Sequence, residues 1–384
     1  MGESGIRKIC VVTGNRAEYS KLKPVMQEIN SRPDLDLILI VTASHLLDDF
    51  GKTIEVIKED GFKISAVART VAAGEDLGSM VKSVGLCALE LPTLFDFYNP
   101  DIVLITGDRF DVLGVAVSAA FMNIPLAHME GGEVTGAIDE SVRHAITKFA
   151  HIHFPATEKS AQRLIKMGER PELVFNVGSP SADVILEKKG KPFDENLLEK
   201  YHIFKKPFLL AIQHPVTTEY DKCKEQMKET LLAFSELDMH ALMLFPNVDA
   251  GSKDMVREIR LLKESGRLDK VSFWKNVPFE DYIALMAQAV CFVGNSSSGM
   301  RETCYFGTPT VNIGTRQQGR ERGRNVVDVN HNKEEIKQAV LSAMSHGKYE
   351  PEHIYGSGNS SQKIAHTLSG LDLRNIIQKK TTLV

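Results

Sequence analysis

Short apolar segments alternate with longer amphipathic segments along almost the whole chain of 384 residues. Several apolar segments are apolar throughout, as strands buried on both faces of a sheet are. The segments between them, such as 17–30, 78–97 and 112–122, are typical of helices. This alternation predicts doubly wound parallel sheets with helices on both faces. In the first half, strands are predicted at 9–13, 37–41, 102–106, 125–129, 152–154 and 174–177.

The alternation is interrupted at residues 186–206, where charges, Gly190 and Pro192, followed by Pro207, predict a connection between domains. It then resumes, with strands predicted at 208–213, 241–245, 271–274, 290–294 and 310–313. We therefore expect two α/β domains, the first formed by residues 1–185. Ligands bind beyond the carboxyl ends of strands in such sheets, so the residues that follow each strand are the candidates for a site.

Composition narrows the class of protein. The chain is 43% hydrophobic and 25% charged, as globular proteins are, and its net charge of -4 argues against nucleic acid as the main partner. No apolar run approaches the roughly 20 residues that span a bilayer, and residues 1–8 lack the apolar core of a signal peptide, so we expect a cytoplasmic protein. The five scattered cysteines indicate neither a disulfide framework nor a zinc site.

The segment after the first predicted strand contains Gly14 and Arg16. Glycine permits a tight turn, and arginine at the start of a helix is a bidentate ligand for phosphate. The segment lacks the GxGxxG pattern, so it does not predict a dinucleotide cofactor. An ordinary strand–helix turn with a solvated arginine is the alternative.

Carboxylates gather after two neighbouring strands of the first half. Repulsion between clustered carboxylates raises at least one pKa, which is how a general acid or base is made. The alternatives are salt bridges, a helix cap at Asp139, and a metal site, although Arg109 and Arg143 would compete with a cation. The carboxylates are Asp108, Glu130, Glu133 and Asp139.

In the second half, His214 follows the strand predicted at 208–213, and Asn247 lies in the segment after the strand at 241–245. A histidine directly after a buried strand, next to a proline, is well placed for a ligand. A hydrogen-bonded structural histidine is the alternative.

A strand, a turn of small residues and a helix beginning near residue 300 follow one another at 290–306, with the turn sequence GNSSSG at 294–299. Unsatisfied N–H groups at a helix start, together with serine hydroxyls, favour binding of phosphate or diphosphate. Glu302 could accept ribose hydroxyls, and Arg316 adds a cation after the strand at 310–313. Simple helix capping by serine is the alternative.

Taken together, these motifs resemble the hydrolysing UDP-N-acetylglucosamine 2-epimerases of sialic-acid synthesis. The likeness is closest to the epimerase half of the bifunctional animal epimerase/kinase, and it extends to single-function bacterial enzymes. It covers nearly the whole chain through TGNRAEYSK (13–21), SHLLDDFG (44–51), GEDLGSMVKSVGL (74–86), GDRFD (107–111), EGGEVTGAIDESVRHAITK (130–148), QHPVTT (213–218), FPNVDAGSK (245–253), GNSSSGMRE (294–302), FGTPTVNIGTRQQGR (306–320) and IYGSGN (354–359).

The resemblance implies two Rossmann-like domains that face each other across a cleft, as in glycosyltransferase-B-like proteins. The second domain would span 186–360 and bind UDP, and a helix at about 362–369 within 361–384 would return to the first. Chemistry is implied for Asp108, Glu130, Asp139 and His214. Recognition of uracil and diphosphate is implied for Arg16, Ser20, Arg109, Asn247, Ser296, Ser297, Glu302 and Arg316, and an approach to the sugar for His45.

The implied reaction converts UDP-N-acetylglucosamine and water to N-acetylmannosamine and UDP. A base removes the C2 proton while UDP leaves C1, and water then adds to the resulting 2-acetamidoglucal. Neither a redox cofactor nor a metal is expected, and the sequence leaves open which carboxylate is the base. Three alternatives remain: a non-hydrolysing epimerase, a hydrolysing epimerase for another nucleotide-linked amino sugar of the legionaminic-acid type, and a nucleotide-sugar sensor without activity.

A regulatory site is also implied. Lys253, Arg257 and Arg260 share one face of a predicted helix, and with Lys275 they match the segment where the animal enzyme binds the feedback inhibitor CMP-sialic acid at a subunit interface. Asn276 stands where the family has histidine. We expect a homodimer or homotetramer, and a solvated basic face is the alternative for this helix.

Overall fold

The computed structural model describes residues 5–48, 51–72, 74, 76–189, 194, 196–203, 207–247 and 249–378. Gly190 and Pro192 of the predicted connection lie outside these residues, as do residues 379–384. The motifs at 44–51, 74–86 and 245–253 are described only in part.

The described chain forms two compact units. Unit 1 comprises Met1–Glu133, Asp139–Leu186 and Tyr355–Val384, and unit 2 comprises Val134–Ile138 and Glu187–Ile354. The chain therefore leaves unit 1 twice, once for the five residues Val134–Ile138 and once for the long second segment. Each unit has its own sheet and its own hydrophobic core.

Unit 1 is a six-stranded parallel sheet in the order β3-β2-β1-β4-β5-β6. The order reverses between the neighbours β1 and β4, and this is the position at which doubly wound sheets bind ligands. Short 3-10 helices lie at Ala43–Leu46 and Pro171–Leu173. The strands and α-helices are β1 (Arg7–Thr13), α1 (Arg16–Ser31), β2 (Leu35–Thr42), α2 (Ile54–Glu59), β3 (Ala66–Ala68), α3 (Leu77–Tyr98), β4 (Ile102–Thr106), α4 (Phe110–Phe121), β5 (Leu126–Met129), α5 (Ile138–Phe149), β6 (Ile152–Phe154), α6 (Glu158–Lys166), α7 (Pro180–Lys188) and α14 (Ser360–Gly370).

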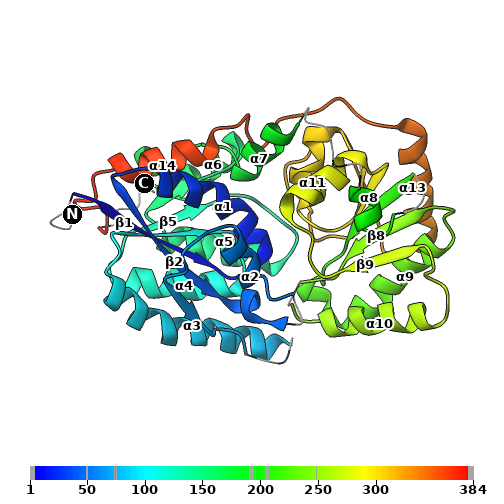
Figure 1. The fold of residues 1–384 in the computed structure, drawn as a ribbon, viewed down its shortest axis with the longest axis horizontal. Helices are drawn as coiled ribbons and strands as arrows, with labels where there is room; N and C mark the ends of the chain where they lie inside the picture. Colours follow the sequence, from blue (N-terminus) through cyan, green and yellow to red (C-terminus); the bar gives the residue numbers. More distant parts are fainter. Residues whose placement is uncertain are drawn as a thin grey trace. The chain divides into compact units, whose positions relative to one another are not determined.

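Helices cover both faces of this sheet (Figure 1). Helices α1 and α14 bury Leu22, Val25 and Leu368 against one face. Helices α3 and α4 bury Leu91 and Ala116 against the other. Because both faces are covered, the central strands are almost entirely apolar, which is why they could be recognised in the sequence.

Unit 2 repeats this topology. Its six parallel strands have the order β12-β11-β10-β7-β8-β9, with the reversal between β7 and β10. Further 3-10 helices lie at Thr217–Lys222 and Thr303–Phe306. The strands and α-helices are α8 (Leu197–Lys200), β7 (Phe208–Ile212), α9 (Cys223–Ser235), β8 (His240–Leu244), α10 (Ser252–Glu264), β9 (Val271–Trp274), α11 (Phe279–Gln288), β10 (Cys291–Gly294), α12 (Ser298–Arg301), β11 (Thr310–Ile313), β12 (Val326–Val329) and α13 (Lys333–His346).

The two parallel α/β units confirm the predicted fold class, while the cleft stays a prediction. One predicted strand is wrong, because within 174–177 only Val174 makes an isolated bridge, to His153. The edge strands β3 and β12 were not predicted. Both are short and partly exposed, so they lack the apolar run that marks the central strands.

Candidate active site

Asp108, in the turn between β4 and α4, is held by a buried arginine from α5. The guanidinium of Arg143 donates from Nη2 to Asp108 and from Nη1 to the backbone carbonyl oxygen of Glu133, at 2.8 Å. The Arg143 side chain is 1% exposed and that of Asp108 is 23% exposed. One buried side chain thus joins the turn after β4 to the loop after β5.

Three carboxylates act on Arg143. Burial by itself lowers the pKa of the guanidinium, but the charges of Asp108, Glu133 and Asp139 overcome this effect and raise it. The structure therefore brings together three of the four predicted carboxylates around one cation. Asp139 is not the cap of α5, because the helix begins at Ile138 and Asp139 lies inside its first turn. A negative charge is favourable at that end of a helix.

Glu130, the fourth carboxylate, directly follows β5 and has its own partners. Its Oε2 lies 2.5 Å from Nζ of Lys21 on α1, and its Oε1 accepts from Oγ of Ser179 at 3.0 Å. Its backbone is left-handed, with φ 64°, and its N–H donates to the carbonyl oxygen of Phe154 at 2.9 Å. Such a conformation is costly for a non-glycine residue and is common at functional sites. Two segments distant in sequence thus converge on this carboxylate.

A second buried acidic group lies where β1 meets α1. Glu18 accepts from the N–H of Gly14 at 2.7 Å and from the side-chain amide of Asn15. Burial, and next the charge of Asp111, raise the pKa of Glu18 to about 8. Asp111 in turn lies 3.4 Å from Nε of Arg109. Gly14 lies directly against this pair, because a Cβ at this position would come within 2.3 Å of Oδ2 of Asp111.

The arginines predicted to bind diphosphate in unit 1 lie at helix starts. Arg16 is the first residue of α1, and Ser20 follows one turn later with its hydroxyl donating to the carbonyl oxygen of Ala17 at 3.0 Å. Both are partly exposed. Arg109 directly precedes α4, and its guanidinium lies 5.0 Å from the ring of Phe110.

His45, which is expected to approach the sugar, is buried at the end of β1, and its approach to the sugar stays a prediction. It is fully buried, and its Nε2 and Nδ1 lie 3.0 and 2.6 Å from the hydroxyls of Thr13 and Thr53. Burial lowers its pKa to about 3. A neutral histidine with both ring nitrogens engaged by threonines fixes the end of β1.

In unit 2, His214 follows β7 and is oriented by two asparagines. Asn295, after β10, accepts from the His214 N–H at 2.7 Å and donates to the His214 carbonyl oxygen at 2.9 Å. The backbone N–H of Asn247 points at Nδ1 of His214, at 3.2 Å. A ring nitrogen that accepts cannot carry a proton, so neutral His214 has its proton on Nε2. The imidazole therefore presents Nε2 as a donor.

The turn after β10 is tight. A Cβ on Gly294 would lie 1.9 Å from the carbonyl oxygen of Ile212, so only glycine fits. Ser296 is 7% exposed, and its Oγ lies 3.4 Å from the N–H of Ser298. Ser297 precedes α12, which spans only Ser298–Arg301 before a 3-10 helix begins. The regular helix expected up to residue 306 is thus interrupted, and its dipole is smaller than the sequence suggested.

Arg316 lies in the loop after β11. Its Nη1 and the side-chain amide of Gln317 both donate to the backbone carbonyl oxygen of Asn295, at 3.2 and 2.8 Å. The carbonyl oxygen of Arg316 accepts from the N–H of Gly136 at 3.1 Å. Glu302, at the end of α12, is 4% exposed. The loop that carries Arg316 is therefore fastened to the residue that orients His214.

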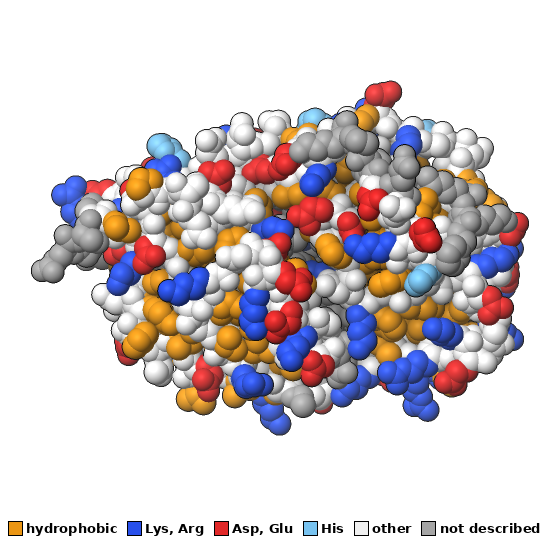
Figure 2. Space-filling view, viewed as in Figure 1, with side chains coloured by type: hydrophobic (Ala, Val, Ile, Leu, Met, Phe, Trp, Pro, Cys, Tyr) orange, Lys and Arg blue, Asp and Glu red, His pale blue; other side chains and the backbone are white. Residues whose placement is uncertain are grey.

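The predicted regulatory residues are exposed. Lys253, Arg257 and Arg260 lie on the outer side of α10, and Lys275 is exposed after β9. Figure 2 shows basic side chains gathered over α10, at the lower right.

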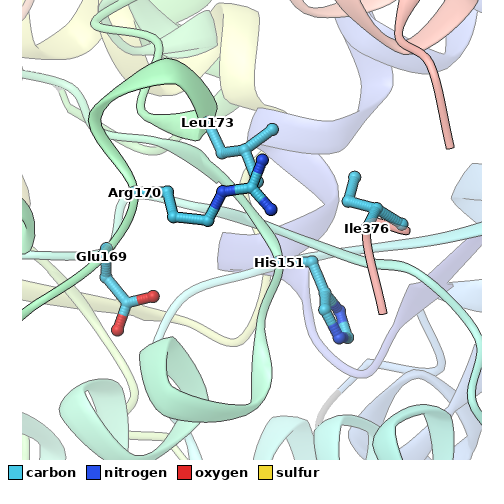
Figure 3. A pocket seen from close by; sticks show the side chains of 5 residues that line it. All are labelled: His151, Glu169, Arg170, Leu173 and Ile376. Carbon is cyan, nitrogen blue, oxygen red and sulfur yellow. The ribbon is translucent and has the colours of Figure 1, made fainter. Parts of the chain in front are cut away.

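Other features of the described residues do not form a substrate site. A cavity of about 10 Å³ in unit 1 is lined by His151, Glu169, Arg170, Leu173 and Ile376 (Figure 3). It has room for at most one water molecule. All five cysteines are buried thiols, and the described part of the chain has no cluster of metal-ligating side chains. No described helix is long and apolar enough to cross a bilayer.

Several residues of these clusters were missed in the sequence: Glu18, Lys21, Asp111, Ser179 and Asn295. Arg143 was noted only as a competitor for a cation. All of them except Ser179 lie within a quoted motif, so for these residues proximity to a strand end was the available signal. Their pairing could not be predicted, because partners such as Lys21 and Glu130 are distant in the sequence.

Comparison with known proteins shows which family the sequence resembles. The sequence profile described as UDP-N-acetylglucosamine 2-epimerase matches residues 27–369. The UDP-N,N'-diacetylbacillosamine 2-epimerase (hydrolyzing) of Legionella pneumophila is 36% identical and aligns over 98% of this chain and 99% of the relative. The UDP-N-acetylglucosamine 2-epimerase of Neisseria meningitidis serogroup B is 31% identical over 98% of each chain.

Solved structures with a similar fold include a protein that carries the same family name. A solved UDP-GlcNAc 2-epimerase from Neisseria meningitidis, bound to UDP-GlcNAc, superimposes with a TM-score of 0.78 at 18% identity, covering 94% of this chain and 99% of that one. The fold is therefore one that a solved nucleotide-sugar enzyme also has. The chain belongs to the UDP-N-acetylglucosamine 2-epimerase family. This confirms the broader family that was predicted, while the hydrolysing branch of sialic-acid synthesis and the closer likeness to the animal enzyme stay predictions.

Proposed function

We propose that this protein is a hydrolysing UDP-N-acetylglucosamine 2-epimerase, which converts UDP-N-acetylglucosamine and water to N-acetylmannosamine and UDP. The observation that carries the proposal is the arrangement of carboxylates at the carboxyl edge of the first sheet. Asp108 and Glu130 follow the paired strands β4 and β5, and each has a cationic partner. Asp139 lies within the electrostatic reach of Arg143, the partner of Asp108.

This edge suits the proton transfers of the reaction. The C2–H of the sugar is weakly acidic, so its removal is coupled to departure of UDP from C1 and needs a fixed base. Return of a proton to the other face of C2 needs a second group. Carboxylates on separate supports, with Glu130 held by Lys21 and Ser179 and Asp108 held by Arg143, supply groups for both steps.

Unit 2 suits the leaving group. Nε2–H of His214, the guanidinium of Arg316 and the hydroxyls of Ser296 and Ser297 are donors near the carboxyl ends of β7, β10 and β11. Donors fixed before the reaction stabilise the charge that develops on a departing diphosphate. We assign His214 to binding the diphosphate as a neutral donor, because the N–H of Asn247 occupies Nδ1. Glu302 is assigned to the ribose.

A second substrate has specific support. The Legionella relative, which is more similar than the Neisseria one, is named for UDP-N,N'-diacetylbacillosamine. That sugar also carries a 2-acetamido group, so the same elimination and hydration would apply to it. Feedback inhibition by CMP-sialic acid at α10 and assembly into a homo-oligomer are further parts of the proposal that rest on the family resemblance.

The test is incubation of the protein with each nucleotide sugar in deuterated water, followed by NMR of the products. Free UDP together with the 2-epimeric free sugar, deuterated at C2, is the expected result. A product that keeps UDP attached would identify a non-hydrolysing epimerase. Faster turnover of the diacetylbacillosamine substrate would replace the first assignment by the second. Binding of both nucleotide sugars without any deuterium at C2 would indicate a sensor and contradict the proposal.

A further inference from the structure

We infer that Arg143 is a positioning residue of the reaction: it holds Asp108 and the loop after β5 in the arrangement that proton transfer requires. The inference rests on the proposed function and extends it to a residue outside the implied catalytic set. Arg143 does not need to touch the substrate for this role, since it acts through the groups that it holds.

The guanidinium of Arg143 binds two separate groups at once. One arm of the guanidinium holds the Asp108 carboxylate, which follows β4, and the other holds the carbonyl oxygen of Glu133 at 2.8 Å. Both contacts come from one rigid helix, α5, whose first turn carries Asp139. A shift of Arg143 would therefore move Asp108 and the Glu133 loop relative to Asp139.

The charges around Arg143 also support a positioning role for this residue. Asp108, Glu133 and Asp139 repel one another, and Arg143 is the cation on which all three act. Its side chain is 1% exposed, so water does not screen these interactions as it does at the surface. Removal of the positive charge would take away the cation that these three acidic groups share.

Lysine cannot reproduce this support. The guanidinium is planar and its fixed fork reaches two acceptors at once, whereas an ammonium group is a compact point charge on a flexible chain. Arg143→Lys therefore keeps the charge and removes the geometry. It is also the milder variant, because a buried cation is retained opposite Asp108.

A matched control lies on the same helix. Lys148, in the last turn of α5, forms an ion pair of 2.7 Å with the buried Glu169 and has no part in the proposed site. Lys148→Met removes a cation of α5 that pairs with a buried carboxylate, but it leaves the first turn of the helix unchanged.

The experiment measures kcat, KM, the pH profile of kcat, UDP affinity and melting temperature for wild type, Arg143→Lys and Lys148→Met. For Arg143→Lys we expect kcat to fall by about 100-fold or more, with KM and UDP affinity within about threefold of wild type. The acid limb of its profile should move to higher pH, because a carboxylate that loses a hydrogen bond to its charged form protonates more readily. Lys148→Met should keep the wild-type kcat and profile.

Two results would overturn the inference. The first is an Arg143→Lys enzyme with kcat within threefold of wild type. The second is a parallel loss of kcat, UDP affinity and melting temperature, which would mean that Arg143 only supports the fold. Turnover by the wild type is measured first: its absence refutes the proposed function, whereas its presence with an unaffected variant refutes only the role of Arg143.

Discussion

Asn295 holds both backbone polar groups of His214, accepting from its N–H at 2.7 Å and donating to its carbonyl oxygen at 2.9 Å. The two residues follow the neighbouring strands β10 and β7, and Asn295 is fully buried. The orientation of the His214 imidazole thus depends on one amide side chain that belongs to another strand. The backbone carbonyl oxygen of Asn295 also accepts hydrogen bonds from the side chains of Arg316 and Gln317.

Asn295→Ala should therefore weaken UDP binding and destabilise unit 2. Two buried hydrogen bonds are lost and the backbone groups of His214 lose these partners, which costs on the order of 2 kcal/mol. We expect at least a tenfold loss of UDP affinity in calorimetric titration and a lower urea midpoint. Asn330→Ala, which removes an exposed contact with Glu335, is the control and should change neither. Unchanged UDP affinity would refute the role of Asn295.

The catalytic assignment is tested by Asp108→Asn, Glu130→Gln and Asp139→Asn. Each change keeps the shape of the side chain and removes its capacity to exchange a proton. We expect turnover to fall by roughly 100-fold or more in each, with UDP still bound. Glu172→Gln, in an exposed pair with Arg170, should have no effect. Near-normal turnover in all three variants would show that the chemistry lies elsewhere.

Glu18 should make stability depend on pH. Burial, together with Asp111, raises its pKa from 4.5 to about 8 in the folded protein. Between these values the native state holds a proton that the unfolded chain releases, so stability is lost as the pH rises through this window. Glu18→Gln should therefore melt at a higher temperature than wild type at pH 8.5, and the difference should shrink at pH 5. A constant difference would contradict the assignment, and the exposed Glu225→Gln serves as control.

Gly136 should be needed for the loop that carries Arg316. An alanine Cβ at this position would lie 2.0 Å from the carbonyl oxygen of Thr315, so the backbone of the loop must move. We expect Gly136→Ala to weaken UDP binding at least tenfold. Gly85→Ala is the matched control, because nothing lies within 4 Å of its Cβ and alanine favours the helix α3 by up to about 1 kcal/mol. Equal UDP affinities for both variants would rule out this coupling.

The proposed feedback site on α10 can be tested with CMP-sialic acid and a variant of Arg260. Millimolar CMP-sialic acid should lower the initial rate and favour a tetramer in sedimentation. Arg260→Gln should abolish this inhibition and leave uninhibited turnover largely intact, because the residue is exposed on a helix that carries none of the catalytic candidates. An inhibitor that changes neither rate nor sedimentation of the wild type would leave α10 as a solvated basic face.

The main architecture could be predicted from the sequence. Strands covered on both faces must be apolar along their whole length, so the central strands were recognisable, and the polar residues that follow them were recognised as candidates. This placed Asp108, Glu130 and His214 at strand ends without any knowledge of their partners. The segment at 174–177 was mistaken for a strand because it is also short and mostly apolar, although it makes a single bridge.

The tertiary structure alone decided how these residues are paired. Whether Asp108 contacts Arg143, Glu130 contacts Lys21, or His45 is enclosed by Thr13 and Thr53 depends on strand order and on the rotation of each helix about its axis. Local sequence carries no direct record of either, since the partners of Asp108 and Glu130 lie 35 and 109 residues away. The residue types and their positions at strand ends could therefore be predicted from the sequence. Their protonation, orientation and partners follow from packing in the folded protein.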